Sequence, residues 1–330
     1  MQALIGGLGV GLALGALMSR ETICFNAGLR RAAFERRWRI LRIFAIAVAA
    51  QLLLLPLLIG FDATLFSSPD ELPAIGLFPI SQVLGGLLFG AGMALAGGCI
   101  TGILWKSGAG SIATAIAIGG FVAGELLIRG PLEDLLTELD GAVEPPADQT
   151  LYGLFGVGYV PLALILGVVA LALLWRGSRR VLLAGLLLAL IGAAAWLAAG
   201  WAGYGYGLGF VGAAENAQLS IEAGDPGMLS FAFFLAVGVI AGGAAATRGP
   251  LRRPDRARAL RAATGGLAMG VGGSLAHGCN IGNGLTGIPL LSLGSILATT
   301  MMALGAVATW RFALSPSTRL RGTETPEPNW

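Results

Sequence analysis

Residues 85–102, GGLLFGAGMALAGGCITG, are repeated 180 positions later in residues 265–282, GGLAMGVGGSLAHGCNIG. Ten of the eighteen aligned residues are identical, and both copies carry a Gly-Cys pair at the same place. An internal repeat of this kind indicates two related halves. Each half is expected to present one thiol at a corresponding position, so the functional site is predicted where Cys99 and Cys279 meet.

The composition is that of a membrane protein. Hydrophobic residues make up 55% of the chain and charged residues only 12%, whereas soluble domains carry about 25% charge. The 53 glycines suit close helix packing in lipid. The sequence therefore predicts an all-α, polytopic integral membrane protein with about nine transmembrane segments. They are residues 2–19, 43–60, 81–98, 111–128, 151–175, 181–200, 229–247, 263–279 and 294–312.

Three of these segments are predicted to be interrupted or re-entrant helices. Segments 2–19, 81–98 and 263–279 are rich in glycine. Cys24 follows the first segment closely, Cys99 directly follows the second, and Cys279 is the last residue of the third. Irregular backbone at membrane depth is tolerated only where protein covers it or where it lines a polar cavity. The interruptions therefore point to an internal pathway.

Basic and acidic loops alternate along the chain, which predicts its topology. The positive-inside rule places the N-terminus in the periplasm and the C-terminus in the cytoplasm of a bacterial inner membrane. Only Arg129 among the 21 basic residues falls clearly outside, and Glu125 one turn earlier is its expected partner. The basic loops hold Arg30, Arg31, Arg36, Arg37, Arg39, Arg42, Lys106, Arg176, Arg179, Arg180, Arg248, Arg252, Arg253, Arg256, Arg258 and Arg261, and the tail holds Arg311, Arg319 and Arg321. The acidic ones hold Asp62, Asp70, Glu71, Glu133, Asp134, Glu138, Asp140, Glu144, Asp148, Glu215, Glu222 and Asp225.

With this topology, the helices leading to Cys99 and Cys279 enter from opposite faces, so the repeats are inverted. Inverted repeats with interrupted helices are typical of transporters whose substrate site lies near the membrane midplane. We expect a first half at residues 1–150, a linking transmembrane helix at 151–180, a second half at 181–315 and a cytoplasmic tail at 316–330.

The candidate site residues surround the two repeated cysteines. Gly98 and Gly278 allow backbone N–H groups to turn toward an anion, and polar side chains follow at Thr101, Asn280, Asn283 and Thr286. A single free cysteine in a glycine-rich face is commonly a small packing residue. Two cysteines at equivalent points of a repeat favour a function.

Two further candidates remain open between a functional and a structural role. Cys24 lies in a short polar break with Arg20, Glu21 and Asn26; ionisable residues at that depth are functional candidates, although an Arg20–Glu21 contact at the end of a helix is an equal alternative. His277 either serves as a hydrogen-bonding packing residue, or it donates to an anion or modulates the pKa of Cys279. The GxxxG pairs Gly86/Gly90 and Gly266/Gly270 indicate helix packing.

Other chemistry has little support in the sequence. The three cysteines include no CxxC, and there is no P-loop, dinucleotide fingerprint or HExxH helix. We therefore expect no enzyme activity, no cofactor, no metal site and no nucleic-acid partner, with membrane lipids around the spans. The competing hypotheses are a membrane thiol-disulfide oxidoreductase and a soft-metal or selenium-compound transporter.

The runs GGCITG, HGCNIGNGLTGIPLLSLGS and SRETICFNAGLRRA resemble motifs of the YeeE/YedE family of sulfur-compound transporters. The resemblance covers essentially the whole chain and is nearer to the thiosulfate-transporting branch. It implies an inner-membrane protein of about nine spans in which thiosulfate passes Cys24, Cys99 and Cys279 by hydrogen bonds from their thiols. It also implies a cytoplasmic TusA-like sulfur-carrier partner. The long acidic loop at 129–150 is unusual for an anion importer.

Overall fold

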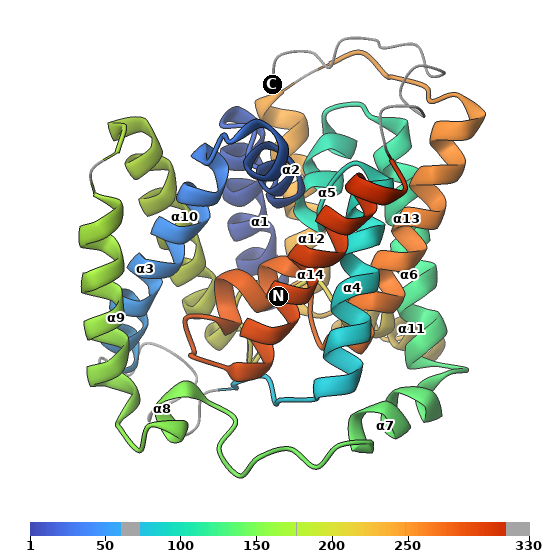
Figure 1. Ribbon diagram of the computed structural model, residues 1–330. Coiled ribbons are helices and arrows are strands. Elements are labelled where there is room, and N and C mark those ends of the chain that lie inside the picture. The colour runs from blue at the N-terminus through green and yellow to red at the C-terminus, as the bar shows by residue number, and fades with distance from the viewer. Residues whose placement is uncertain (61–72, 176, 248, 315–330) are drawn as a thin grey trace.

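The structure is a computed structural model that describes residues 1–60, 73–175, 177–247 and 249–314. It is a bundle of long helices with short helices between them (Figure 1). The loop at 61–72, Arg176, Arg248 and the predicted tail at 316–330 lie outside the described residues. The long helices are α1 (Gln2–Arg20), α3 (Arg39–Gly60), α4 (Pro79–Ala96), α6 (Ile112–Arg129), α9 (Tyr159–Leu174), α10 (Arg179–Trp201), α12 (Phe231–Ala246), α13 (Arg256–Leu275) and α14 (Leu293–Phe312). The short ones are α2 (Phe25–Glu35), α5 (Ile100–Gly108), α7 (Glu133–Gly141), α8 (Leu151–Leu154), α11 (Ala213–Ala223), η2 (Pro226–Met228) and η3 (Gly282–Gly287).

The long helices confirm the predicted all-α membrane fold. Six segments of the described chain are long and apolar enough to cross a membrane, and α9 and α12 are apolar but shorter. Helix α13 corresponds to the eighth predicted segment, and it opens with the charged residues Arg256, Arg258 and Arg261. The fifth predicted segment was too long, because residues 151–175 divide into α8 and α9. Gly156, with φ 62°, turns the chain between them.

Helices α4 and α13, which carry the sequence repeat, pack against each other in opposite directions. A Cβ on Gly85 would lie 2.7 Å from the carbonyl oxygen of Gly272, and one on Gly92 would lie 2.6 Å from that of Gly265. Gly85 is the repeat equivalent of Gly265, and Gly92 that of Gly272. Exchanging the two copies therefore turns each of these contacts into the other, as a two-fold axis between antiparallel helices requires.

The GxxxG pairs pack as predicted, and each uses a different neighbour. A Cβ on Gly86 or Gly90 would collide with α14, and a Cβ on Gly266 or Gly270 would collide with the backbone of α6. The absence of side chains lets these helices approach to backbone contact, which is how glycine stabilises helix pairs in lipid. Helix α14 therefore packs against α4, and helix α6 packs against α13, on either side of the repeated pair.

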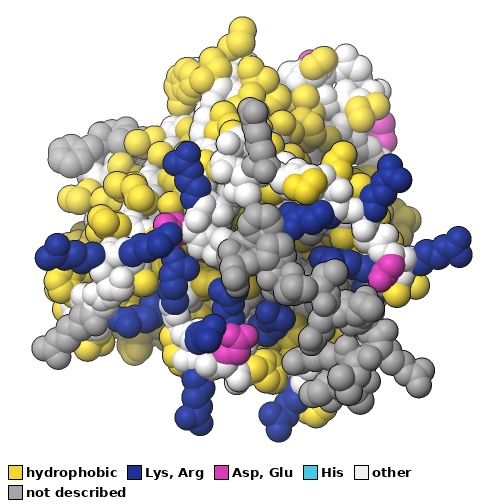
Figure 2. All heavy atoms as spheres, turned by 90° about the horizontal axis from the view of Figure 1, so that it is seen from above, with side chains coloured by type: hydrophobic (Ala, Val, Ile, Leu, Met, Phe, Trp, Pro, Cys, Tyr) yellow, Lys and Arg dark blue, Asp and Glu magenta, His cyan; other side chains and the backbone are white. Residues whose placement is uncertain are grey.

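The two ends of the bundle differ in charge. Seen from the end that carries α2, most of the charged side chains that can be seen are Lys and Arg (Figure 2). We call this end the basic face. The acidic helix α7 and helix α11 lie at the opposite end (Figure 1), which we call the acidic face. The predicted separation of loop charge is therefore a property of the folded surface.

Candidate functional site

Each of the three cysteines follows the same backbone turn at the end of a long helix. Two residues before each cysteine the chain is left-handed, at Thr22 (φ 51°), Gly97 (φ 74°) and His277 (φ 53°). In each turn, the residue directly before the cysteine donates its N–H to a helix carbonyl five positions back, with N···O distances of 2.8, 3.2 and 2.9 Å. This is the Schellman ending of a helix. The predicted interruptions at these three places are confirmed.

A second helix starts at each cysteine. The carbonyl oxygens of Cys24, Cys99 and Cys279 accept the first hydrogen bonds of α2, α5 and the turn that leads into η3, at 2.8 to 2.9 Å. A residue in this position stands beside the free N–H groups of the first helical turn. Those N–H groups and the helix dipole favour negative charge. Each thiol therefore sits at the positive end of a half-helix.

Two of the thiols are in contact. The sulfur of Cys24 lies 3.6 Å from that of Cys99, and Thr101 Oγ1 lies 3.4 Å from Cys99 Sγ. Gly102 makes room for the pair, since a Cβ there would lie 2.6 Å from Cys24 Sγ. We expected Cys99 to meet Cys279, but the sulfur contact in the described chain is with Cys24. All three cysteines are free and buried.

Cys279 instead lines a cavity of about 360 Å³. Its sulfur accepts a hydrogen bond from the backbone N–H of Gly282 at 3.3 Å. A Cβ on Gly278 would lie 2.8 Å from Asn283 Nδ2, so glycine is needed at that position. The cavity is also lined by the segments 73–76 and 209–211 and by Phe78, Arg129, Tyr204, Tyr206, His277 and Gly282.

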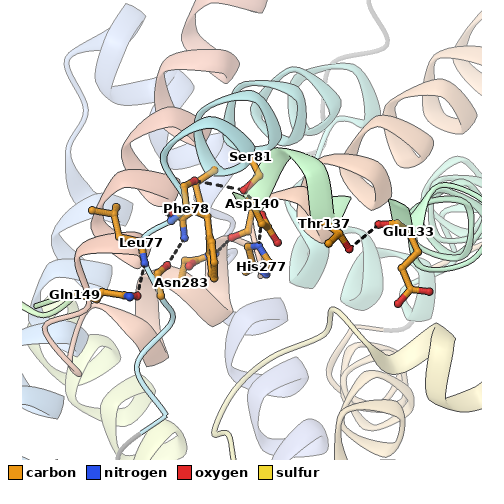
Figure 3. A network of polar contacts seen from close by, with 12 residues as sticks. Leu77, Phe78, Ser81, Glu133, Thr137, Asp140, Gln149, His277 and Asn283 are labelled. Carbon is orange, nitrogen blue, oxygen red and sulfur yellow. Dashed lines mark hydrogen bonds and ion pairs between the residues drawn. The ribbon is translucent and has the colours of Figure 1, made fainter. Parts of the chain in front are cut away.

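His277 is held by the acidic face rather than by Cys279. Its Nε2 lies 3.0 Å from Asp140 Oδ1, and the same oxygen accepts from Ser81 Oγ at 2.5 Å (Figure 3). Its ring lies on that of Phe78, with centroids 4.5 Å apart. The only histidine of the chain therefore ties α7 to the turn that presents Cys279, and it remains part of the cavity wall.

Several buried polar groups near the thiols lack a partner. Asn280, which is 2% exposed, has no hydrogen bond on either amide atom within the described part of the chain. The Oδ1 atoms of Asn26 and Asn283 are also unsatisfied there. Thr286 is satisfied, since its hydroxyl donates to the Leu208 carbonyl at 2.8 Å. Unsatisfied buried polar groups are costly, and a polar ligand passing the thiols offers them partners.

Arg20 and Glu21 lie at the end of α1, before the turn that precedes Cys24. Arg20 is exposed, and Glu21 accepts from Arg39 at 2.6 Å and from Arg180 at 3.1 Å. The Arg20–Glu21 contact that the sequence left open is thus replaced by ion pairs that link α1 to α3 and α10. Their position on the basic face suits a structural role.

Three residues that line the cavity were not predicted as site residues from the sequence. Tyr204 and Tyr206 were missed, and Arg129 was expected to pair with another residue. Arg129 lines the cavity and pairs with Glu215 at 2.9 Å, rather than with Glu125 as predicted. Tyr204 and Tyr206 also line it. Burial, and next the negative charge of Glu125, raises the pKa of the Tyr204 phenol, which therefore keeps its proton as a donor. The GYGYG run containing both tyrosines was visible in the sequence as a polar break without cysteine.

Comparison with known proteins gives one family. The sequence profile of the sulphur transport family matches residues 20–182 and again residues 175–308. A thiosulfate transporter TsuA from Escherichia coli K12 is 26% identical over 357 aligned positions, which cover 96% of this chain and 97% of the relative. A protein of the same name from Spirochaeta thermophila is 29% identical, with 91% of this chain and 96% of the relative covered.

Proposed function

Because this chain belongs to the sulphur transport family, the YeeE/YedE family that its motifs resemble, we propose that it is a permease that imports thiosulfate across the inner membrane. Its relatives are transporters, and it is a transporter rather than an enzyme. The observation that carries the proposal is that three free, buried thiols stand at the starts of three half-helices. That arrangement supplies weak sulfur donors together with backbone N–H donors.

The chemistry of thiosulfate fits these donors. A dianion in the membrane interior needs compensation at every stop, because uncompensated charge there costs several kcal/mol. Half-helix ends and the amide of Asn280 offer donors for the oxygens, with Thr101 beside Cys99 as a further one. The terminal sulfur is a soft, weak acceptor, and a thiol S–H is a weak donor. The ion is therefore held loosely enough to move on without a covalent bond.

The proposed path begins in the cavity on the acidic side and passes Cys279, then Cys99 and Cys24. Arg129 in the cavity wall attracts the anion, despite the acidic helix α7 nearby. Cys99 and Cys24 are then reached as a pair, with Cys24 nearer the cytoplasm. At the far end, the basic face is the side on which a TusA-like sulfur carrier would receive the product of transport.

We propose that the two halves, residues 1–150 and 181–315, are inverted copies joined by the linker at 151–180. The exchange symmetry of the α4–α13 contact and the double match of the family profile support this division. The antiparallel course of the two repeated helices supports the inversion. In transporters built from inverted repeats the substrate path lies at the interface of the halves.

The orientation follows from the positive-inside rule and is open to a direct test. A cysteine introduced at Gly141, an exposed residue on the acidic face, is expected to react with an impermeant thiol reagent added outside cells. Cysteines introduced between Arg31 and Arg39 should react only after the membrane is broken. The reverse pattern would end the inverted-topology argument.

Uptake of labelled thiosulfate tests the function itself. Cells that lack other importers should accumulate the label when they express this chain, and unlabelled thiosulfate should compete better than sulfate. A thiol-disulfide oxidoreductase, which the contact between Cys24 and Cys99 would also suit, predicts thiol oxidation without accumulation. Purified protein in liposomes separates these outcomes, because no other carrier is present.

A further inference from the structure

Glu125 is a buried acid that the anion path does not use. It lies on α6 with 0% of its surface exposed. Among the described residues, Glu125 is the only charged one that is buried. Its Oε1 accepts hydrogen bonds from the backbone N–H groups of Gly212 at 2.6 Å and Ala214 at 3.3 Å. Its Oε2 is buried and has no partner within the described chain.

The carboxylate lies directly behind the wall of the cavity. The segment 209–211 lines the cavity, and Gly212, which donates to Glu125, is the next residue. Arg129, one helical turn from Glu125, lines the cavity as well. Tyr204 lines the cavity too. An anion in the cavity is therefore within the field of this carboxylate, because one layer of backbone separates the two.

We propose that Glu125 is the proton-binding site through which the transporter couples the entry of one proton to the entry of the anion. This inference rests on the proposed transport of thiosulfate and adds its energy source. A second negative charge nearby disfavours the ionised form of a buried carboxylate. The arriving dianion therefore drives Glu125 to take up a proton. Linkage is reciprocal, so protonation of Glu125 also strengthens binding of the anion.

The geometry of the carboxyl group suits a reversible proton. Both backbone donors bind Oε1, so a proton that joins Oε2 breaks none of the hydrogen bonds that the structure records for Glu125. The segment from Gly212 to Ala214 stays attached in both states. The step is a simple association, in which the carboxylate and a proton from the periplasmic side form the neutral acid. The proton leaves to the cytoplasmic side after the anion does.

The other charged groups near Glu125 are less suited to this role. Glu215 on α11 is ion-paired with Arg129 and its side chain is 36% exposed. Asp140 on α7 is shared by His277 and Ser81. Cys279 precedes the turn that leads into η3, and its sulfur accepts a hydrogen bond from the backbone N–H of Gly282. On α13, which packs along α6, the arginines at 256, 258 and 261 lie in its first turns, whereas Glu125 contacts that helix at Gly270.

Proton coupling also answers an energetic problem of this substrate. A bare dianion entering a cell moves two negative charges against an inside-negative potential. One accompanying proton halves that charge, and the work against the potential falls in proportion. A buried acid beside the entrance cavity is the simplest device by which the protein can provide this.

The experiment uses the full-length protein in liposomes that contain a pH-sensitive dye. The membrane potential is held at zero with potassium and valinomycin. Adding thiosulfate outside is expected to acidify the interior in step with uptake of labelled thiosulfate. The KM for thiosulfate should rise with external pH, with a limit of about tenfold per pH unit for one linked proton. Glu125→Gln, a permanent neutral mimic, should lose the acidification, and its KM should no longer depend on pH.

Two further variants separate coupling from folding. Glu125→Asp keeps a titratable group and should keep acidification. Glu222→Gln, the same chemical change on α11 at an exposed position, should behave like the parent. If Glu125→Gln does not reach the membrane, the parent and Glu125→Asp measurements still decide the matter. Thiosulfate entry in the parent without acidification, or unchanged acidification in Glu125→Gln, overturns the coupling and leaves the transport function intact. No thiosulfate entry in the parent overturns both.

Discussion

The break before Cys279 and the break after α10 have the same backbone but different chemistry. After α10, Gly203 has φ 69° and Tyr204 donates its N–H to the Ala199 carbonyl at 2.8 Å, as in the three cysteine turns. Two residues beyond the left-handed position stands Gly205, where the other breaks have cysteine. The helix break is therefore a repeated feature of the backbone, and the thiol is a separate addition.

The three thiols also divide into two environments. Cys24 and Cys99 share one buried contact at 3.6 Å, with Gly102 against both sulfurs. Cys279 faces the cavity and accepts a hydrogen bond from Gly282. The single thiol therefore suits capture of the ion from the cavity, and the pair suits its onward passage.

Removal of a thiol should have the largest effect. Cys99→Ala and Cys279→Ala are expected to abolish thiosulfate uptake, and Cys24→Ala to weaken or abolish it, because the soft donor is lost at one stop. Cys→Ser should retain partial activity at most, since it replaces a soft donor with a hard one. Uptake by cells is measured beside the amount of protein in the membrane. A triple alanine variant that imports at the parent rate would make the cysteines packing residues.

Gly102→Ala should come next, because it forces the paired thiols apart without removing them. The new Cβ would lie 2.6 Å from Cys24 Sγ and 3.4 Å from Cys99 Sγ. A misplacement of about 1 Å at a positioned group can cost about 100-fold in rate, so we expect a fall in uptake of at least about tenfold. Gly119→Ala is the matched control, since nothing lies within 4 Å of a Cβ there. Equal uptake by the two variants would argue against the thiol pair as a stop on the path.

Arg129→Gln should affect the capture side. Hydrogen bonds to charged groups are worth about 1.5–3 kcal/mol, so KM should rise about tenfold or more while the maximal rate falls less. The concentration dependence of uptake measures this, with Arg258→Gln on an exposed turn of α13 as the control. An unchanged KM would remove the cavity from the route of the anion.

The smallest effect is expected from the turns themselves. Thr22 adopts a left-handed backbone that disfavours side chains, whereas Gly97 occupies the same position without strain. Thr22→Gly should therefore stabilise the protein by about 1 kcal/mol, and Gly97→Ala should destabilise it by about the same amount. Thermal unfolding in detergent measures both. Shifts of the same sign for the two variants would show that factors other than φ decide the turns.

The repeat predicted two inverted halves and a meeting of Cys99 with Cys279. The packing of α4 on α13 supports the first prediction, whereas the sulfur contact that the structure records for Cys99 is with Cys24. Equivalent residues under a two-fold axis touch only if they lie close to that axis. Gly85 packs against Gly272 rather than against its own equivalent, Gly265. The GxxxG pairs likewise identified a packing face without naming its partner, because any smooth helix surface can occupy it.

What the sequence determined by itself is local in origin. Runs of apolar residues decided which segments can cross a membrane, loop charges divided the faces, and glycine beside cysteine marked two of the helix breaks. Only the tertiary structure decided which distant side chains meet. Cys24 and Cys99 are 75 positions apart, Arg129 and Glu215 are 86 apart, and His277 and Asp140 are 137 apart. Such pairs come together through the packing of whole helices, whose geometry depends on every contact along them and is not encoded in any one stretch of the chain.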